Sequence, residues 1–277
     1  MSYGIYGENN DETIVFLTGF GTLSPILTYG PLAKTLSEKF KVIIVEPFGY
    51  GRSDFTEAPR THENIVEELH TFVHKLVIKK FYISGHSLGG LYSLFYANQY
   101  SDDVLGFIGF DNAIPQYDDV IIEDNKIRSE MYDELNNQYH NDILVKMPYN
   151  EKVELIKLIL DPNYNYLEKE INAYITIFDR TYGSDNIVDE YHNVLRDMHD
   201  SINLKFPKSI PSLQIIATEG GAIYGKDEYM KSHQSIIYES PLNDIIYLEG
   251  NHYIMFGQHE NILKEIEKWI KKLNNQK

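Results

Sequence analysis

Short, largely apolar runs recur along the chain, separated by stretches in which apolar residues keep helical spacing. Runs of this length without polar alternation are typical of strands that are buried on both faces of a sheet. They occur at residues 13–17, 41–45, 81–83, 104–110, 213–217 and 244–248. Helical spacing marks residues 31–40, 61–76, 91–100 and 262–273. The alternation predicts an α/β fold in which helices cover both faces of a mostly parallel central sheet.

The pattern changes between residues 112 and 206, where helical periodicities replace the strand-like runs and tyrosine is frequent. We therefore expect a helical cap, inserted after the strand at 104–110. The predicted division is a core of residues 1–111 and 207–277 with a cap of residues 112–206. Parallel sheets bind ligands at the carboxyl ends of their strands, so the cap is expected to lie over these ends.

The sequence Gly-His-Ser-Leu-Gly-Gly at residues 85–90 lies between a predicted strand and a predicted helix. A serine with a glycine two residues away on each side, at a strand-to-helix turn, is the pattern of a nucleophile elbow. Such a turn strains the serine backbone and directs the hydroxyl out of the sheet. Ser87 is therefore the candidate nucleophile. Side chains at Gly85 and Gly89 would collide with the crossing helix and strand, and His86 is expected to be a packing residue.

A serine hydroxyl needs a base within hydrogen-bond reach, and the tetrahedral intermediate needs two backbone N–H donors. His252 directly follows the last predicted strand, which is where a base partner of this elbow is expected. Leu88, the residue after the nucleophile, is the candidate for one oxyanion donor. Phe20, in the glycine loop at residues 18–21, is the candidate for the other, although a purely structural turn is the alternative for this loop.

These segments together resemble the α/β-hydrolase superfamily, and in particular its capped single-domain members, which include lipases, esterases, prolyl aminopeptidases and non-haem haloperoxidases. The resemblance rests on residues 18–21, 47–53, 85–90 and 250–252. Thr18 departs from the histidine common in the family's oxyanion loop, and Glu46 from the usual aspartate before the proline. The N-terminus is also too short for the first strand of the full sheet. The first two departures leave the backbone donors intact.

The resemblance implies an acid that orients His252, and two residues are candidates for it. Most members place the acid a few residues after the strand that follows the cap, where this chain has Glu219 but glycine at the usual position. A smaller set, which includes some haloalkane dehalogenases, places it at the end of the strand after the elbow helix. That position is Asp111 here. The sequence favours Asp111, with Glu219 as the alternative acid. The other interpretation of Asp111 is that its side chain caps the first helical turn of the inserted segment.

Two weaker motifs do not change this interpretation. His70 and His74 lie one helical turn apart, as metal ligands do, but no glutamate completes a His-Glu-x-x-His motif. The glycine-containing segment 220–226 begins like a phosphate-binding loop, but Asp227 stands where such a loop needs serine or threonine. We therefore expect an ordinary loop there, and neither a metal nor a cofactor.

Composition restricts the partners and the compartment. The 277 residues contain 25 lysines and arginines against 41 aspartates and glutamates, a formal net charge of −16. Without a basic patch, such a surface repels nucleic acid and anionic membranes, so neither is expected as a partner. No signal peptide or membrane-length apolar run is found in the sequence, and it has no cysteine. We expect a cytoplasmic protein without disulfides or thiolate sites.

The function predicted from the sequence is that of a serine hydrolase, which cleaves a small, largely apolar carboxylic ester through an acyl-enzyme intermediate. A peptidase or amidase of the same fold is one alternative. A catalytically silent ligand-binding protein on this scaffold is another. Epoxide and haloalkane hydrolases of this fold use an aspartate nucleophile, whereas position 87 is serine. The oligomeric state is left open by the sequence.

Overall fold

The computed structural model describes residues 1–276, in which seven strands form one sheet in the order β1-β3-β2-β4-β5-β6-β7. β1 pairs antiparallel with β3, and all other neighbours run parallel. The strands are β1 (Ser2–Tyr6), β2 (Thr13–Leu17), β3 (Lys41–Glu46), β4 (Phe81–His86), β5 (Val104–Phe110), β6 (Ser212–Ala217) and β7 (Asp244–Leu248). This is the mostly parallel sheet that the apolar runs predict.

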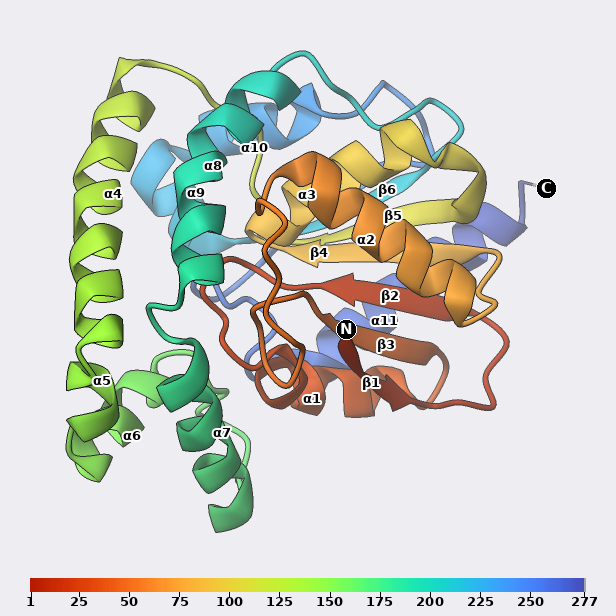
Figure 1. The fold of residues 1–277 in the computed structure, drawn as a ribbon. Coiled ribbons are helices and arrows are strands. Elements are labelled where there is room, and N and C mark those ends of the chain that lie inside the picture. The colour runs from red at the N-terminus through yellow and green to blue at the C-terminus, as the bar shows by residue number, and fades with distance from the viewer. Residues whose placement is uncertain (277) are drawn as a thin grey trace.

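Two pairs of helices cover the two faces of the sheet (Figure 1). α1 (Pro25–Leu36) and α11 (His259–Asn274) pack on one face, and α2 (His62–Lys75) and α3 (Leu88–Gln99) on the other. Each pair encloses its own cluster of buried apolar side chains against the strands. The core therefore consists of two apolar layers, one on each side of the sheet, and the carboxyl ends of the parallel strands stay available for polar groups.

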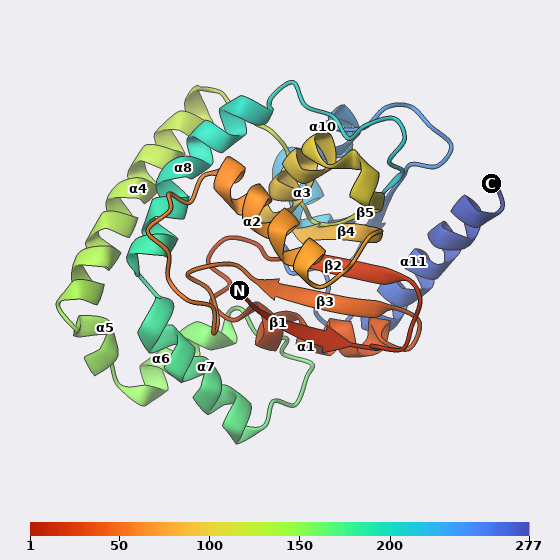
Figure 2. The same ribbon diagram turned by 45° about the vertical axis from the view of Figure 1, so that its right-hand side comes forward.

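Five helices are inserted between β5 and β6. They are α4 (Asp119–His140), α5 (Ile143–Lys146), α6 (Tyr149–Lys157), α7 (Glu168–Thr181) and α8 (Asp185–Ser201). Figures 1 and 2 show α4 and α8 side by side, beyond the carboxyl ends of the strands. Within residues 1–276, no helix has both the length and the apolar character needed to cross a bilayer.

The structure differs from the sequence predictions at three places. The first helix begins at Pro25, and the predicted start at Pro31 is wrong because Pro31 lies inside the helix. Segment 220–226 is not a loop, because α9 (Thr218–Tyr224) and α10 (Lys226–Ser235) occupy it, joined at Gly225 with a φ of 84°. The edge strand β1 was not predicted, because it is short and alternates between half-buried and exposed residues instead of forming an apolar run.

Candidate active site

Ser87 lies between the last residue of β4 and the first residue of α3, in the turn expected of a nucleophile elbow. Its backbone has a φ of 49° and a ψ of −125°, a strained conformation for a residue with a side chain. A Cβ on Gly85 would lie 2.4 Å from the carbonyl of Gly89, and a Cβ on Gly89 would lie 2.6 Å from the carbonyl oxygen of Leu17. The glycines thus permit the close crossing of helix and strand that exposes Ser87.

The imidazole of His252 and the carboxylate of Asp111 lie in direct contact, with 2.7 Å between Nδ1 and Oδ2. Because a carboxylate accepts hydrogen bonds, Nδ1 carries the proton and Nε2 is left as a proton acceptor. Ser87 and His252 line the same cavity, although no hydrogen bond joins their side chains within residues 1–276. In structures without substrate, hydrogen bonds between catalytic side chains are often long or absent and form only in the complex, so this geometry does not conflict with a serine–histidine pair.

Asp111 is the most constrained member of this group, since its side chain is only 4% exposed. Oδ1 accepts hydrogen bonds from the backbone N–H of Ala217 at 2.8 Å and from the hydroxyl of Tyr229 at 2.7 Å. Burial alone would raise the pKa of Asp111, but the hydrogen bonds from His252, Ala217 and Tyr229 outweigh it and leave the pKa below its ordinary value. Asp111 is therefore ionised near neutral pH.

Glu219 contacts His252 in a different way. One of its carboxylate oxygens, Oε2, accepts the backbone N–H of His252 at 3.0 Å and does not touch the imidazole. The backbone N–H of Glu219 in turn donates to the carbonyl of Gly250 at 3.2 Å. Glu219 thus holds the loop that carries His252, while Asp111 contacts the ring.

His86 has a polar role that the sequence did not reveal. Its side chain is buried, with Nε2 2.9 Å from the carbonyl oxygen of His252 and Nδ1 3.0 Å from the hydroxyl of Tyr29. A carbonyl only accepts, so Nε2 carries the proton and Nδ1 accepts from the Tyr29 hydroxyl. Burial, followed by the nearby His252, lowers the pKa of His86 to about 3. A neutral His86 therefore ties the His252 loop to the end of β4.

The glycine loop after β2 packs directly on the elbow. A Cβ on Gly19 would lie 2.9 Å from the Cβ of Ser87. Within residues 1–276, the backbone N–H groups of Phe20 and Leu88 have no hydrogen-bond acceptor. The two N–H groups that the sequence proposed as oxyanion donors are therefore unpaired and come from segments in contact with Ser87.

Two tyrosines hold this loop on either side of Phe20. The N–H of Gly19 donates to the hydroxyl of Tyr29 at 3.3 Å, and the N–H of Gly21 donates to the hydroxyl of Tyr50 at 3.2 Å. Tyr50 in turn donates to the carboxylate of Glu190, on α8, at 2.7 Å. The loop is thus fixed to α1 through Tyr29, and to the inserted helix α8 through Tyr50 and Glu190.

The cavity at Ser87 has a volume of about 460 Å³, within the range of small-molecule sites. Inserted helices form part of its wall, through Arg128 of α4 and Met198 of α8. The ring of Phe20 packs against two tyrosines of the same helices, with centroids 5.2 Å from Tyr132 and 5.2 Å from Tyr191. The inserted helices therefore face the serine instead of packing away from it.

Comparison with known proteins agrees with the fold. The family model described as the alpha/beta hydrolase fold matches residues 12–147, a range that includes Ser87. The uncharacterized protein YbdG of Bacillus subtilis is 24% identical over 280 residues, which cover 97% of this chain and 82% of YbdG. The chain belongs to the α/β-hydrolase superfamily.

Solved structures of hydrolases have the same fold. A thermophilic esterase from Thermogutta terrifontis aligns with a TM-score of 0.66 and 18% identity, covering 98% of this chain and 93% of the esterase. The epoxide hydrolase VrEH1 from Vigna radiata aligns with a TM-score of 0.73 and 15% identity, covering 98% and 94%. At these identities the likeness concerns the fold, which hydrolases of different chemistry share.

The buried, neutral His86 predicts a specific pH dependence of stability. Its pKa is about 3 when folded and ordinarily near 6.5 when unfolded, so the unfolded chain takes up a proton that the folded chain does not. Stability from this residue is complete above about pH 6.5 and falls by up to about 1.4 kcal/mol per pH unit below it. The variant His86→Gln keeps a donor but cannot titrate.

Urea unfolding of both proteins at pH 7, 6 and 5, followed by circular dichroism, checks this dependence. We expect the free energy of unfolding of the wild type to decline more steeply than that of His86→Gln. Parallel declines would contradict a neutral buried His86.

Proposed function

We propose that this protein is a serine hydrolase that cleaves a small, largely apolar carboxylic ester through an acyl-enzyme intermediate. The observation that carries the proposal is the 2.7 Å contact between His252 Nδ1 and Asp111 Oδ2, beside a serine on a strained elbow. An ionised carboxylate in this position fixes the tautomer of the imidazole that can accept a proton from serine. The thermophilic esterase that shares the fold of this protein also supports this class of reaction.

In the first half of the reaction, Ser87 Oγ attacks the ester carbonyl carbon while His252 Nε2 accepts the hydroxyl proton. Asp111 stabilises the imidazolium that forms. The N–H groups of Phe20 and Leu88 donate to the developing oxyanion, and no existing hydrogen bond has to break because neither is paired within residues 1–276. Collapse of the intermediate expels the alcohol, which takes the proton from His252, and leaves Ser87 acylated.

In the second half, water attacks the acyl carbon and His252 Nε2 takes its proton. The tetrahedral intermediate expels Ser87 Oγ, which regains the proton, and the carboxylic acid leaves. Each proton moves through the same nitrogen, so an imidazole held in one tautomer serves both halves. His86 and Glu219 contribute by holding the backbone of His252.

The lining of the cavity supports this substrate class. Ile114, Met198 and Ile223 supply apolar surface near Ser87, which suits an uncharged acyl group. Arg128 also lines the cavity, but its guanidinium is already paired with Asp124 at 2.7 Å. We take residues 112–206 as the cap that sets the shape of this cavity, so acyl chain length is the property it should select.

The activity test uses p-nitrophenyl esters of increasing acyl length, with matched anilides to detect an amidase. We expect hydrolysis of the short, uncharged esters. Ser87→Ala should lower kcat by about three orders of magnitude or more, because only oxyanion and binding contributions remain. A purified wild type with no turnover of any ester or anilide would favour the silent ligand-binding alternative. Wild-type turnover in Ser87→Ala would exclude the serine mechanism.

A matched pair of isosteric variants distinguishes the two acids. Asp111→Asn should lower kcat by about four orders of magnitude, because an amide stabilises the wrong tautomer of His252. Glu219→Gln should lower kcat less than about tenfold, since its amide oxygen still accepts the backbone N–H of His252. Steady-state kinetics on the best ester gives both values. The reverse ranking would transfer the role of orienting acid to Glu219.

A further inference from the structure

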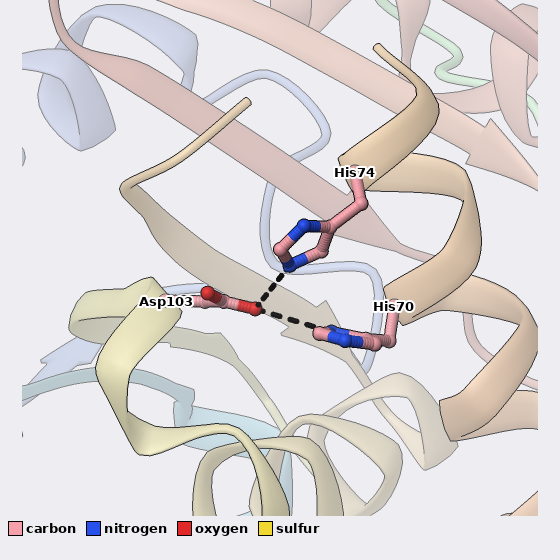
Figure 3. Close-up of side chains that lie close together, drawn as sticks. All are labelled: His70, His74 and Asp103. Atoms are coloured by element: carbon pink, nitrogen blue, oxygen red, sulfur yellow. Dashed lines mark hydrogen bonds and ion pairs between the residues drawn. The ribbon is translucent and has the colours of Figure 1, made fainter. Parts of the chain in front are cut away.

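A second group of ligand-type side chains lies at the opposite edge of the sheet from Ser87. His70 and His74 project from the same side of α2, near the helix end that leads into β4. Asp103 closes the short helix η1 (Ser101–Asp103), which runs directly into β5. Figure 3 shows the three side chains converging, and one ligand atom from each lies within 4.8 Å of the others.

The spacing of these atoms suits a shared metal ion. Asp103 Oδ2 lies 3.2 Å from His70 Nδ1 and 3.3 Å from His74 Nε2. Ligands about 2.0–2.1 Å from a tetrahedral zinc ion are separated from one another by about 3.3 Å. Both distances also exceed the roughly 2.7–2.9 Å usual for hydrogen bonds between charged nitrogen and carboxylate groups. The three ligand atoms are therefore spaced as ligands of one ion are, and Asp103 Oδ2 also lies within hydrogen-bond reach of His74 Nε2.

Neighbouring side chains orient two of the ligands. The His70 ring stacks on Tyr100, with centroids 3.7 Å apart and an angle of 2° between the planes. The hydroxyl of Tyr96 donates to Asp103 Oδ2 at 2.8 Å. Partners of this kind fix ring and carboxylate orientation in metal sites. The His74 side chain is 53% exposed, so solvent reaches the cluster and can supply a further ligand.

We propose that His70 Nδ1, His74 Nε2 and Asp103 Oδ2 bind a divalent transition-metal ion, with zinc as the best match, and that water completes the coordination. Two imidazoles and one carboxylate suit zinc and its neighbours, whereas magnesium and calcium prefer oxygen ligands alone. The ion would join the end of α2 to the segment before β5. It would stabilise the fold at a distance from the serine chemistry, and the site does not depend on the proposed hydrolase activity.

The sequence indicated only two of the three proposed ligands. The pair His70 and His74 has metal-ligand spacing, but no adjacent glutamate follows it. The third ligand lies 29 residues beyond His74 and reaches it only because α3 returns the chain to the amino ends of the strands. A second group, His62 with Glu63 and Asp200, has similar composition. It is the weaker candidate, because His62 Nδ1 already contacts the buried Asp197 at 2.8 Å.

The test is calorimetric titration of zinc chloride into the full chain at pH 7.5, after treatment with a chelator and its removal. We expect one zinc ion per chain. His70→Ala and His74→Ala should each weaken the affinity at least about tenfold. His62→Ala tests the second group, and His192→Ala, which removes an exposed histidine of the inserted helices, is the matched control. Both should keep the wild-type affinity.

Two further readouts separate specific binding from loss of fold. Zinc should raise the melting temperature of the wild type but not of His74→Ala, whose far-ultraviolet circular dichroism should match the wild type because His74 is half exposed. Cobalt bound to the wild type should give the visible absorption of a four-coordinate ion, and His74→Ala should lack it. Unchanged zinc affinity in the His70→Ala/His74→Ala double variant, or its loss in His62→Ala, would overturn the proposal.

Discussion

The contact between Asp111 and His252 depends on three strands ending at the same edge of the sheet. Asp111 directly follows β5, Ala217 ends β6, and His252 lies four residues beyond the end of β7. Parallel pairing brings these ends together, so the backbone N–H of Ala217 and the ring of His252 reach the two oxygens of one carboxylate. The sheet therefore supplies the geometry of the site, and a shift of β6 in register would separate its members.

Buried polar contacts fix the loops that the sheet itself does not hold. His86 binds the backbone of the His252 loop, and Tyr29 joins His86 to the glycine loop before Ser87. On the other side, Tyr50 and Tyr92 both donate to Glu190 of α8, and burial raises the pKa of this carboxyl group. Because such groups are costly to bury unpaired, each contact favours one arrangement of the loops and the inserted helices.

The sequence was sufficient to predict the features that depend on residues close together in the chain. The apolar runs gave six of the strands, and the glycine spacing around Ser87 indicated the elbow, because both are set by neighbouring residues. The choice between Asp111 and Glu219 rested on the family resemblance, because both residues come shortly after predicted strands. In the structure both contact His252, Asp111 at the ring and Glu219 at the backbone. His86 and Asp103 could not be assigned in advance, because their partners are distant in sequence and meet only through the fold.

Labelling with a fluorophosphonate tests most directly whether Ser87 is an activated nucleophile. The serine oxygen would attack phosphorus and expel fluoride, so the adduct does not depend on knowing the substrate. We expect one phosphonyl group per chain, on the peptide that contains Ser87, and much slower labelling of His252→Ala. Equal labelling rates in wild type and His252→Ala, or an adduct on a different residue, would contradict that expectation.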